Sequence, residues 1–248
     1  METWTHGTVA TQSWLNSQGV YRQLSEAYVR SGWLTRIGRG AFIRKGEKVD
    51  WTGGLFALQK QLHLHVHVAA KTALELKGYA HYVPLGTDRT VSLLGSSGTK
   101  LPAWFLTYPW HVNVQYTTTG LFRNEEKLGL SKFNADSFGI EISTPERAIM
   151  ELIYLLPKKA HFEDTQLAME SLTTLRPKLV QSLLENCKSV RVKRFFMWLA
   201  EYNQHKWVER LDLENVDFGK GKRTLFKGGY FDKKYQITVP EYYERPDR

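Results

Sequence analysis

Three histidines at alternating positions are the simplest candidates in this chain for the ligands of a metal ion. His63, His65 and His67 are separated by single apolar residues, and on a strand this spacing would put all three imidazoles on one face. Imidazole nitrogens bind zinc and iron, so a metal-dependent nuclease is one hypothesis. Neither HExxH nor CxxC occurs to complete such a site. A half-exposed strand is therefore the better interpretation, and we expect no metal and no cofactor.

Two other features could support chemistry on nucleotides or carbonyl groups. Residues 219–223 (GKGKR) resemble a phosphate-binding loop, but such a loop joins a strand to a helix, and a further strand is expected here. Cys187, the single cysteine, has no histidine near it in the sequence, and no GxSxG occurs to supply a nucleophilic serine. The sequence therefore predicts no catalytic residues and a protein that is not an enzyme.

Residues 20–31 offer a polar surface suited to reading DNA. Apolar residues at 20, 24, 27 and 28 have the spacing of one helix face, which predicts that the remaining side chains point outward. Arginine, amide and hydroxyl groups pair with base edges in the major groove. The side chains expected to contact DNA are Tyr21, Arg22, Gln23, Ser25 and Arg30.

A basic hairpin is predicted directly after this helix. Residues 33–36 and 41–44 have strand character on either side of a turn at 37–40 (IGRG), and a short helix is expected over residues 8–16. The order of helix, glycine-containing turn, helix and hairpin is that of a small winged helix-turn-helix. Its wing would hold Arg36, Arg39 and Arg44 near phosphates or the minor groove. A purely structural helix pair is the alternative, but the positions of the arginines favour DNA binding.

Composition and charge favour a soluble protein with a polyanionic partner. The net charge is +9, and the basic excess lies near the two ends of the chain, which could serve nucleic acid or an acidic protein. One cysteine excludes a disulfide framework and fits a reducing compartment. With neither a long apolar run nor a leader in the sequence, we expect a cytoplasmic location.

The rest of the chain predicts an α+β protein with a mixed α/β C-terminal domain that ends in a β-hairpin. We expect a winged domain over 1–48 and a second domain over 49–248, with a possible subdivision near 142/143. Strands are predicted at 63–68, 79–83, 91–94, 103–107, 112–117 and 138–142 in a mostly antiparallel sheet. A helix capped by Thr52 precedes them, and another begins in the stretch 143–146 (STPE), either through a capping box or through Thr144 followed by a proline.

A second basic region is predicted near the C-terminus. Arg191, Lys193 and Arg194 occupy the first turn of a helix capped by Ser189, where the helix dipole disfavours positive charge. Either an anionic neighbour (a carboxylate of this chain, an acidic partner or a phosphate) compensates this positive charge, or the turn is solvated and the helix bears the unfavourable energy. Six further basic residues lie within 219–234.

Several segments, in order along the chain, resemble the AbiEi-type antitoxins of abortive-infection toxin–antitoxin systems. They are residues 31–34 (SGWL), 37–42 (IGRGAF), 71–82 (KTALELKGYAHY), 143–148 (STPERA), 193–196 (KRFF), 217–223 (DFGKGKR) and 234–240 (KYQITVP). The resemblance implies a phage-defence protein with two roles. One is autorepression by binding inverted repeats in its own promoter, and the other is opposition to a nucleotidyltransferase-like toxin, with or without direct contact.

By this resemblance, operator contacts fall on Tyr21, Arg22, Gln23 and Ser25, with wing contacts from Arg36 and Arg39. The antitoxin surface is expected to include Arg191, Lys193, Arg194, Lys220, Lys222, Arg223 and Lys234, and no catalytic residue is implied. An RNA-binding module that protects the RNA target of the toxin remains an alternative.

Overall fold

The computed structural model describes residues 3–79, 89–123, 127–135, 137–224 and 228–240. It contains two compact units. The first unit holds the N-terminal winged segment and a five-stranded sheet. The second unit is mainly helical and ends in a small sheet. Within the described residues, no helix is long and apolar enough to cross a membrane.

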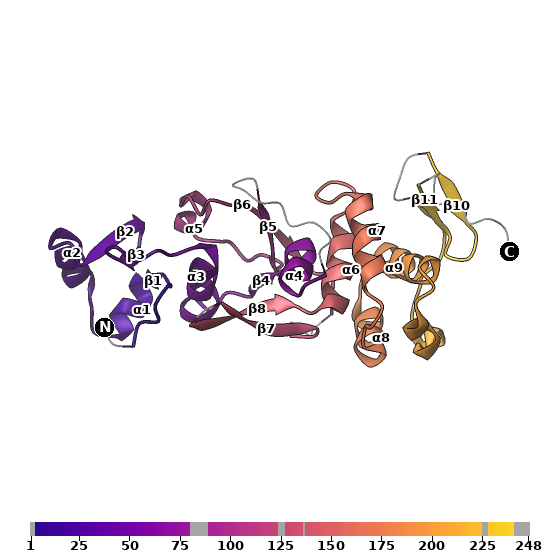
Figure 1. Cartoon of the computed structure of the whole chain (residues 1–248), viewed down its shortest axis with the longest axis horizontal. Coiled ribbons are helices and arrows are strands. Elements are labelled where there is room, and N and C mark those ends of the chain that lie inside the picture. The colour runs from indigo at the N-terminus through magenta and orange to yellow at the C-terminus, as the bar shows by residue number, and fades with distance from the viewer. Residues whose placement is uncertain (1–2, 80–88, 124–126, 136, 225–227, 241–248) are drawn as a thin grey trace. The chain divides into compact units, whose positions relative to one another are not determined.

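The N-terminal segment is a winged helix-turn-helix, as predicted (Figure 1). A three-stranded sheet with the order β1-β3-β2 supports two short helices. Its core consists of Trp4, Ala10, Leu15, Val20, Leu34 and Phe42. The elements are β1 (Ala10–Thr11), α1 (Gln12–Ser17), α2 (Arg22–Arg30), β2 (Leu34–Gly38) and β3 (Ala41–Arg44).

Local sequence explains where the two helices begin and end. The Thr11 hydroxyl caps α1 by accepting a hydrogen bond from the Trp14 amide at 3.3 Å. Gly19 and Gly32 have φ values of +79° and +75°, which a glycine adopts without the penalty that a side chain would add. These two glycines therefore form the turn before α2 and the stop after it.

The first unit also contains a mixed five-stranded sheet with the order β6-β5-β4-β8-β7 (Figure 1). β4 runs antiparallel to β5, whereas the pairs β5–β6 and β4–β8 are parallel, so the expectation of a mostly antiparallel sheet was wrong. The strands are β4 (Val66–Val68), β5 (Thr90–Ser96), β6 (Asn113–Thr119), β7 (Leu130–Ala135) and β8 (Phe138–Ser143). The strand expected at 79–83 falls almost entirely outside the described residues.

Two local predictions in this unit need correction. Residues 103–107 form helix α5 (Ala103–Thr107) rather than a strand, because packing of buried Trp104 and Phe105 outweighs aromatic β-propensity. Asp50, not Thr52, caps α3 (Trp51–Phe56) by accepting hydrogen bonds from the amides of Thr52 and Gly53. α3 continues directly into a π-helical turn, η1 (Ala57–Gln61).

The second unit is built around two buried helices, α6 (Pro145–Leu155) and α9 (Val190–Tyr202). Ser189 caps α9 as predicted, with its hydroxyl accepting from the Val192 amide at 3.3 Å. The remaining elements are α4 (Ala70–Leu76), α7 (Phe162–Ser171), α8 (Pro177–Asn186), the 3₁₀ turns η2 (Lys206–Arg210) and η3 (Leu213–Asn215), and the strands β9 (Arg223–Thr224), β10 (Tyr230–Asp232) and β11 (Ile237–Val239).

The start of α6 carries a buried ionic network. Thr144 is the N-cap residue and Pro145 the first helical residue, so the alternative of a capping box between Ser143 and Glu146 does not form. The Ser143 hydroxyl instead donates to the Glu151 carboxylate at 2.7 Å, and Arg147 Nε donates to the same carboxylate at 2.7 Å. Arg147 and Glu151 are four residues apart on α6, and both are buried.

Candidate nucleic-acid interface

The first residues of α2 present their side chains to solvent. Arg22 and Gln23 are exposed, as is Tyr21 just before the helix, and Arg30 is exposed at the C-terminal end. Their exposure agrees with the helical pattern. They form a surface able to donate and accept hydrogen bonds along one helix.

Ser25 does not belong to this surface, contrary to expectation. Its side chain is buried, and its hydroxyl donates to Gln12 Oε1 at 2.7 Å and to the Arg22 carbonyl at 2.9 Å. The expected places of Ser25 and Leu24 are exchanged, since Leu24 is 39% exposed. The reason is that α2 packs against α1 through a small polar contact from Ser25 to Gln12.

The wing arginine Arg36 is joined to α2. Its guanidinium forms a salt bridge with the Glu26 carboxylate and lies 5.4 Å from the centre of the Phe42 ring. The hydrogen bond from Arg36 lowers the pKa of Glu26, and the charges of Arg22 and Arg30 act in the same direction. Glu26 is therefore an anion surrounded by arginines. At the wing tip, Arg39 is exposed.

Arg44, which the sequence predicts to contact DNA from the wing, is half-buried and engaged within the winged segment. Its guanidinium lies 4.5 Å from the centre of the Trp4 ring, donates to the Trp4 carbonyl and pairs with Glu47. These contacts tie β3 to the N-terminal segment. Arg44 therefore stabilises the winged segment instead of extending its basic surface.

The wing rests on α5, a contact that the sequence did not predict. A Cβ atom placed on Gly38 would lie 2.5 Å from Trp104 Cβ, so only glycine fits there without displacement. Trp104 in turn makes edge contacts with Phe105 and Trp110. The wing is thus held by an aromatic cluster from the same unit.

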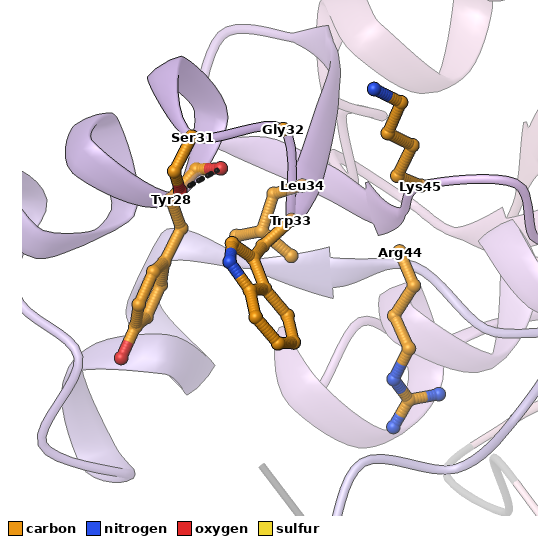
Figure 2. Close-up of a pocket in the computed structure, with 7 residues that line it drawn as sticks. All are labelled: Tyr28, Ser31, Gly32, Trp33, Leu34, Arg44 and Lys45. Atoms are coloured by element: carbon orange, nitrogen blue, oxygen red, sulfur yellow. Dashed lines mark hydrogen bonds between the residues drawn. The ribbon is translucent and has the colours of Figure 1, made fainter.

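A cavity of about 770 Å³ lies at the C-terminal end of α2. In Figure 2 the rings of Tyr28 and Trp33 project to the same side, whereas Lys45 points away from them. Trp33 is 70% exposed. The cavity is lined by Tyr28, Ser31, Gly32, Trp33, Leu34, Arg44 and Lys45. It is separated along the helix from the exposed residues at the start of α2.

The basic first turn of α9 is largely internal, which corrects the predicted antitoxin surface. Arg191 donates to the carbonyl oxygens of Tyr154 and Leu156 at 3.0 and 2.9 Å, so the C-terminal end of α6 supplies partial negative charge to this turn. Burial lowers the pKa of Arg191. Lys193 is buried as well.

Arg194 is also structural. It is buried, and its guanidinium donates to the carbonyl oxygens of Phe218, Gly219 and Gly221 at 2.8, 2.9 and 2.6 Å, with a longer contact of 3.3 Å to the Gln236 carbonyl. The guanidinium therefore fixes the glycine-rich loop to α9. This loop leads into strand β9, not into a helix, as the sequence predicted.

The remaining basic residues of this region are exposed. Lys220, Lys222 and Arg223 lie at the surface, with Lys222 Nζ 5.0 Å from the centre of the Phe231 ring. Lys234 is also exposed and is paired with Glu201 at 2.6 Å. The exposed basic surface of the C-terminal region is therefore smaller than the sequence predicted.

The histidine stretch does not form the expected strand. β4 contains only His67, which is buried, whereas His63 has a φ of +51° and lies outside the strand. Within the described part of the chain, no group of three His, Cys, Asp or Glu residues is placed to hold a metal ion. Cys187 is buried, and burial raises the pKa of its thiol to about 11, which disfavours a reactive thiolate.

Comparison with known proteins identifies the family. The fold is similar to the crystal structure of the RV2827C protein from Mycobacterium tuberculosis, with a TM-score of 0.62 and 16% identity over 95% of this chain and 88% of that chain. No curated protein matches. Residues 1–85 match the model of the AbiEi antitoxin N-terminal domain, and residues 88–240 match the model described as transcriptional regulator, AbiEi antitoxin, type IV TA system. That family consists of regulators and not of enzymes, and together the two models span almost all of the sequence. The chain therefore belongs to the AbiEi family of transcriptional-regulator antitoxins from type IV toxin–antitoxin systems.

Proposed function

We propose that the winged segment represses its own operon by inserting the start of α2 into the major groove of operator DNA. The observation that supports this most directly is the exposure of Arg22 and Gln23 on neighbouring positions of α2. Arginine reads guanine and glutamine reads adenine through paired hydrogen bonds. Arg30 and Arg39 are exposed nearby in the fold of the winged segment and would contact phosphates, and inverted repeats would accommodate two copies.

Arg36 has a conditional role in this proposal. Its guanidinium is paired with Glu26 in the free protein, and a DNA phosphate would compete with that carboxylate for it. Binding to DNA would therefore exchange one ion pair for another. The Glu26 carboxylate would reduce non-specific affinity, because it repels phosphates while the pair persists.

For the antitoxin role, the exposed side chains Lys220, Lys222 and Arg223 are the best candidates. They would oppose a nucleotidyltransferase-like toxin, either by direct contact or by acting on its target. Such a regulator would work in the cytoplasm with the DNA of its operon. This division places operator recognition in the winged segment and toxin antagonism in the C-terminal region.

The test is binding of the full chain to a fragment of its own promoter, measured against a shuffled fragment and a transfer RNA at several salt concentrations. We expect tight binding to the promoter alone, with affinity falling by about 0.9 in log–log slope for each neutralised phosphate. Equal binding to the shuffled fragment would exclude operator recognition. Preference for the transfer RNA would favour the RNA-binding alternative.

A further inference from the structure

Two large apolar side chains are exposed together at the start of α2. Tyr21 is 65% exposed and Leu24 is 39% exposed. They are three residues apart, the spacing at which side chains become neighbours on a helix surface. The same turn carries Arg22 and Gln23, so an apolar pair stands directly beside the polar side chains proposed to read base edges.

The fold does not account for these two side chains. The core of the winged segment is formed by other residues, with Trp14, Tyr28 and Val29 packed against it. Helical periodicity alone would turn Leu24 toward that core, but the interior position is occupied by Ser25. Leu24 is therefore displaced to the surface by the way in which α2 packs on α1.

The charges around the pair indicate what could cover it. Arg22, Arg30 and Arg39 are exposed on α2 and at the wing tip, so a partner that covers this turn should be polyanionic. The major groove of DNA meets both requirements. It is lined by anionic phosphates, and it offers projecting apolar groups at the same depth as the hydrogen-bonding edges of the bases. There the 5-methyl group of thymine is the apolar feature that distinguishes the bases.

We propose that Leu24, with Tyr21 beside it, contacts thymine methyl groups in the operator, so that recognition depends on thymine at positions next to those read by Arg22 and Gln23. This inference rests on the proposed operator binding and specifies its chemistry. RNA would not satisfy the contact, because uracil lacks the methyl group and the major groove of an RNA helix is too deep and narrow for side chains to read.

The experiment compares two versions of the promoter fragment, one made with thymidine and one with deoxyuridine throughout. Uracil keeps the hydrogen-bonding groups of thymine and removes only the methyl group. We expect the wild-type chain to lose about four-fold in affinity on the uracil fragment for each methyl group contacted, since burying one such group contributes roughly 0.8 kcal/mol. Leu24→Ala should bind the thymine fragment more weakly and lose most of this discrimination.

A matched control is available in the same chain. Leu167 on α7 is 44% exposed, and Leu167→Ala removes a leucine of similar exposure from the other compact unit. This variant should discriminate between the two fragments as the wild type does. Thermal unfolding of all three proteins would verify that each is folded.

Two results would overturn the inference while leaving operator binding in place. One is equal affinity of the wild type for the two fragments. The other is full thymine discrimination by Leu24→Ala. If the wild type fails to bind the thymine fragment above its affinity for shuffled DNA, operator binding itself is refuted, and the inference with it.

Discussion

The Arg36 guanidinium in the wing forms a salt bridge with the Glu26 carboxylate on α2. This pair links the two elements that a winged helix-turn-helix uses on DNA. It also leaves an anion on a helix that is otherwise flanked by arginines. The affinity for DNA therefore depends on whether Arg36 pairs with Glu26 or with a phosphate.

Glu26→Gln is expected to tighten binding to DNA of any sequence. In the proposed complex, the change would remove a negative charge that faces the phosphates and would release Arg36 to pair with one of them. The log–log slope of affinity against salt should steepen by about 0.9, the contribution of one additional phosphate. An unchanged slope would mean that Arg36 does not reach the DNA backbone.

Arg22→Ala and Arg44→Ala are expected to have opposite profiles, although both remove an arginine from the winged segment. If exposed Arg22 reads a base, its loss should cost about 1–3 kcal/mol of operator binding and relax specificity at one position. Arg44 contacts Trp4 and Glu47, so its loss should lower the melting temperature and leave specificity intact. Mobility-shift titration and thermal unfolding separate the two effects, and a specificity change in Arg44→Ala would contradict the assignment.

Replacing Lys220, Lys222 and Arg223 together by alanine is expected to abolish toxin neutralisation in a growth assay while operator binding persists. All three are exposed, so stability should change little. Arg194→Gln is the contrasting variant. It removes a guanidinium bonded to several carbonyl oxygens and should cost about 3 kcal/mol of unfolding free energy. Joint loss of both activities in the triple variant would contradict a division of roles.

Arg176→Ala is expected to destabilise the second unit in a pH-dependent manner. Burial raises the pKa of Glu146, but hydrogen bonds from Arg176 at 2.9 and 3.0 Å outweigh this effect and hold the pKa below its usual value. A depressed carboxyl pKa stabilises the fold above the unfolded pKa of about 4.3, and this stabilisation is lost as pH falls through the folded value.

The variant should therefore lose about 1.5–3 kcal/mol of unfolding free energy at pH 7, and the difference from wild type should shrink below about pH 4. Chemical denaturation of both proteins between pH 7 and pH 3 measures this difference in unfolding free energy. Lys178→Ala removes an exposed charge from the same helix start and should have little effect. A difference that stays constant down to pH 3 would exclude the Glu146 pair as its cause.

Most of the winged segment could be predicted from its sequence because its signals are local. Gly19 and Gly32 bracket α2, and the turn at 37–40 separates two short strands. The same is true of Pro145 at the start of α6 and of the buried positions Val192, Phe195 and Phe196 on α9. Each of these features depends on residues within a few positions of one another.

The direction of individual side chains could not be predicted in the same way. Periodicity assigned Leu24 to the interior and Ser25 to the surface, but the hydrogen bond from Ser25 to Gln12 reverses them. Residues 103–107 look like a strand by composition, yet packing of Trp104 and Phe105 selects a helix. In both cases the contact comes from another element, Gln12 on α1 for Ser25 and Gly38 on β2 for Trp104.

By itself, the sequence determined the winged helix-turn-helix and the presence of two basic regions, because glycine positions, apolar spacing and charge are properties of short segments. The family followed from the resemblance of its motifs to known antitoxins. The tertiary structure alone decided which basic residues are available to a partner. Arg44, Arg191 and Arg194 are charged in the sequence like any others, but in the fold each donates to backbone carbonyl oxygens. Arg194 is buried, and Arg44 and Arg191 are half-buried. A buried guanidinium needs such acceptors, and only the folded chain shows where they meet.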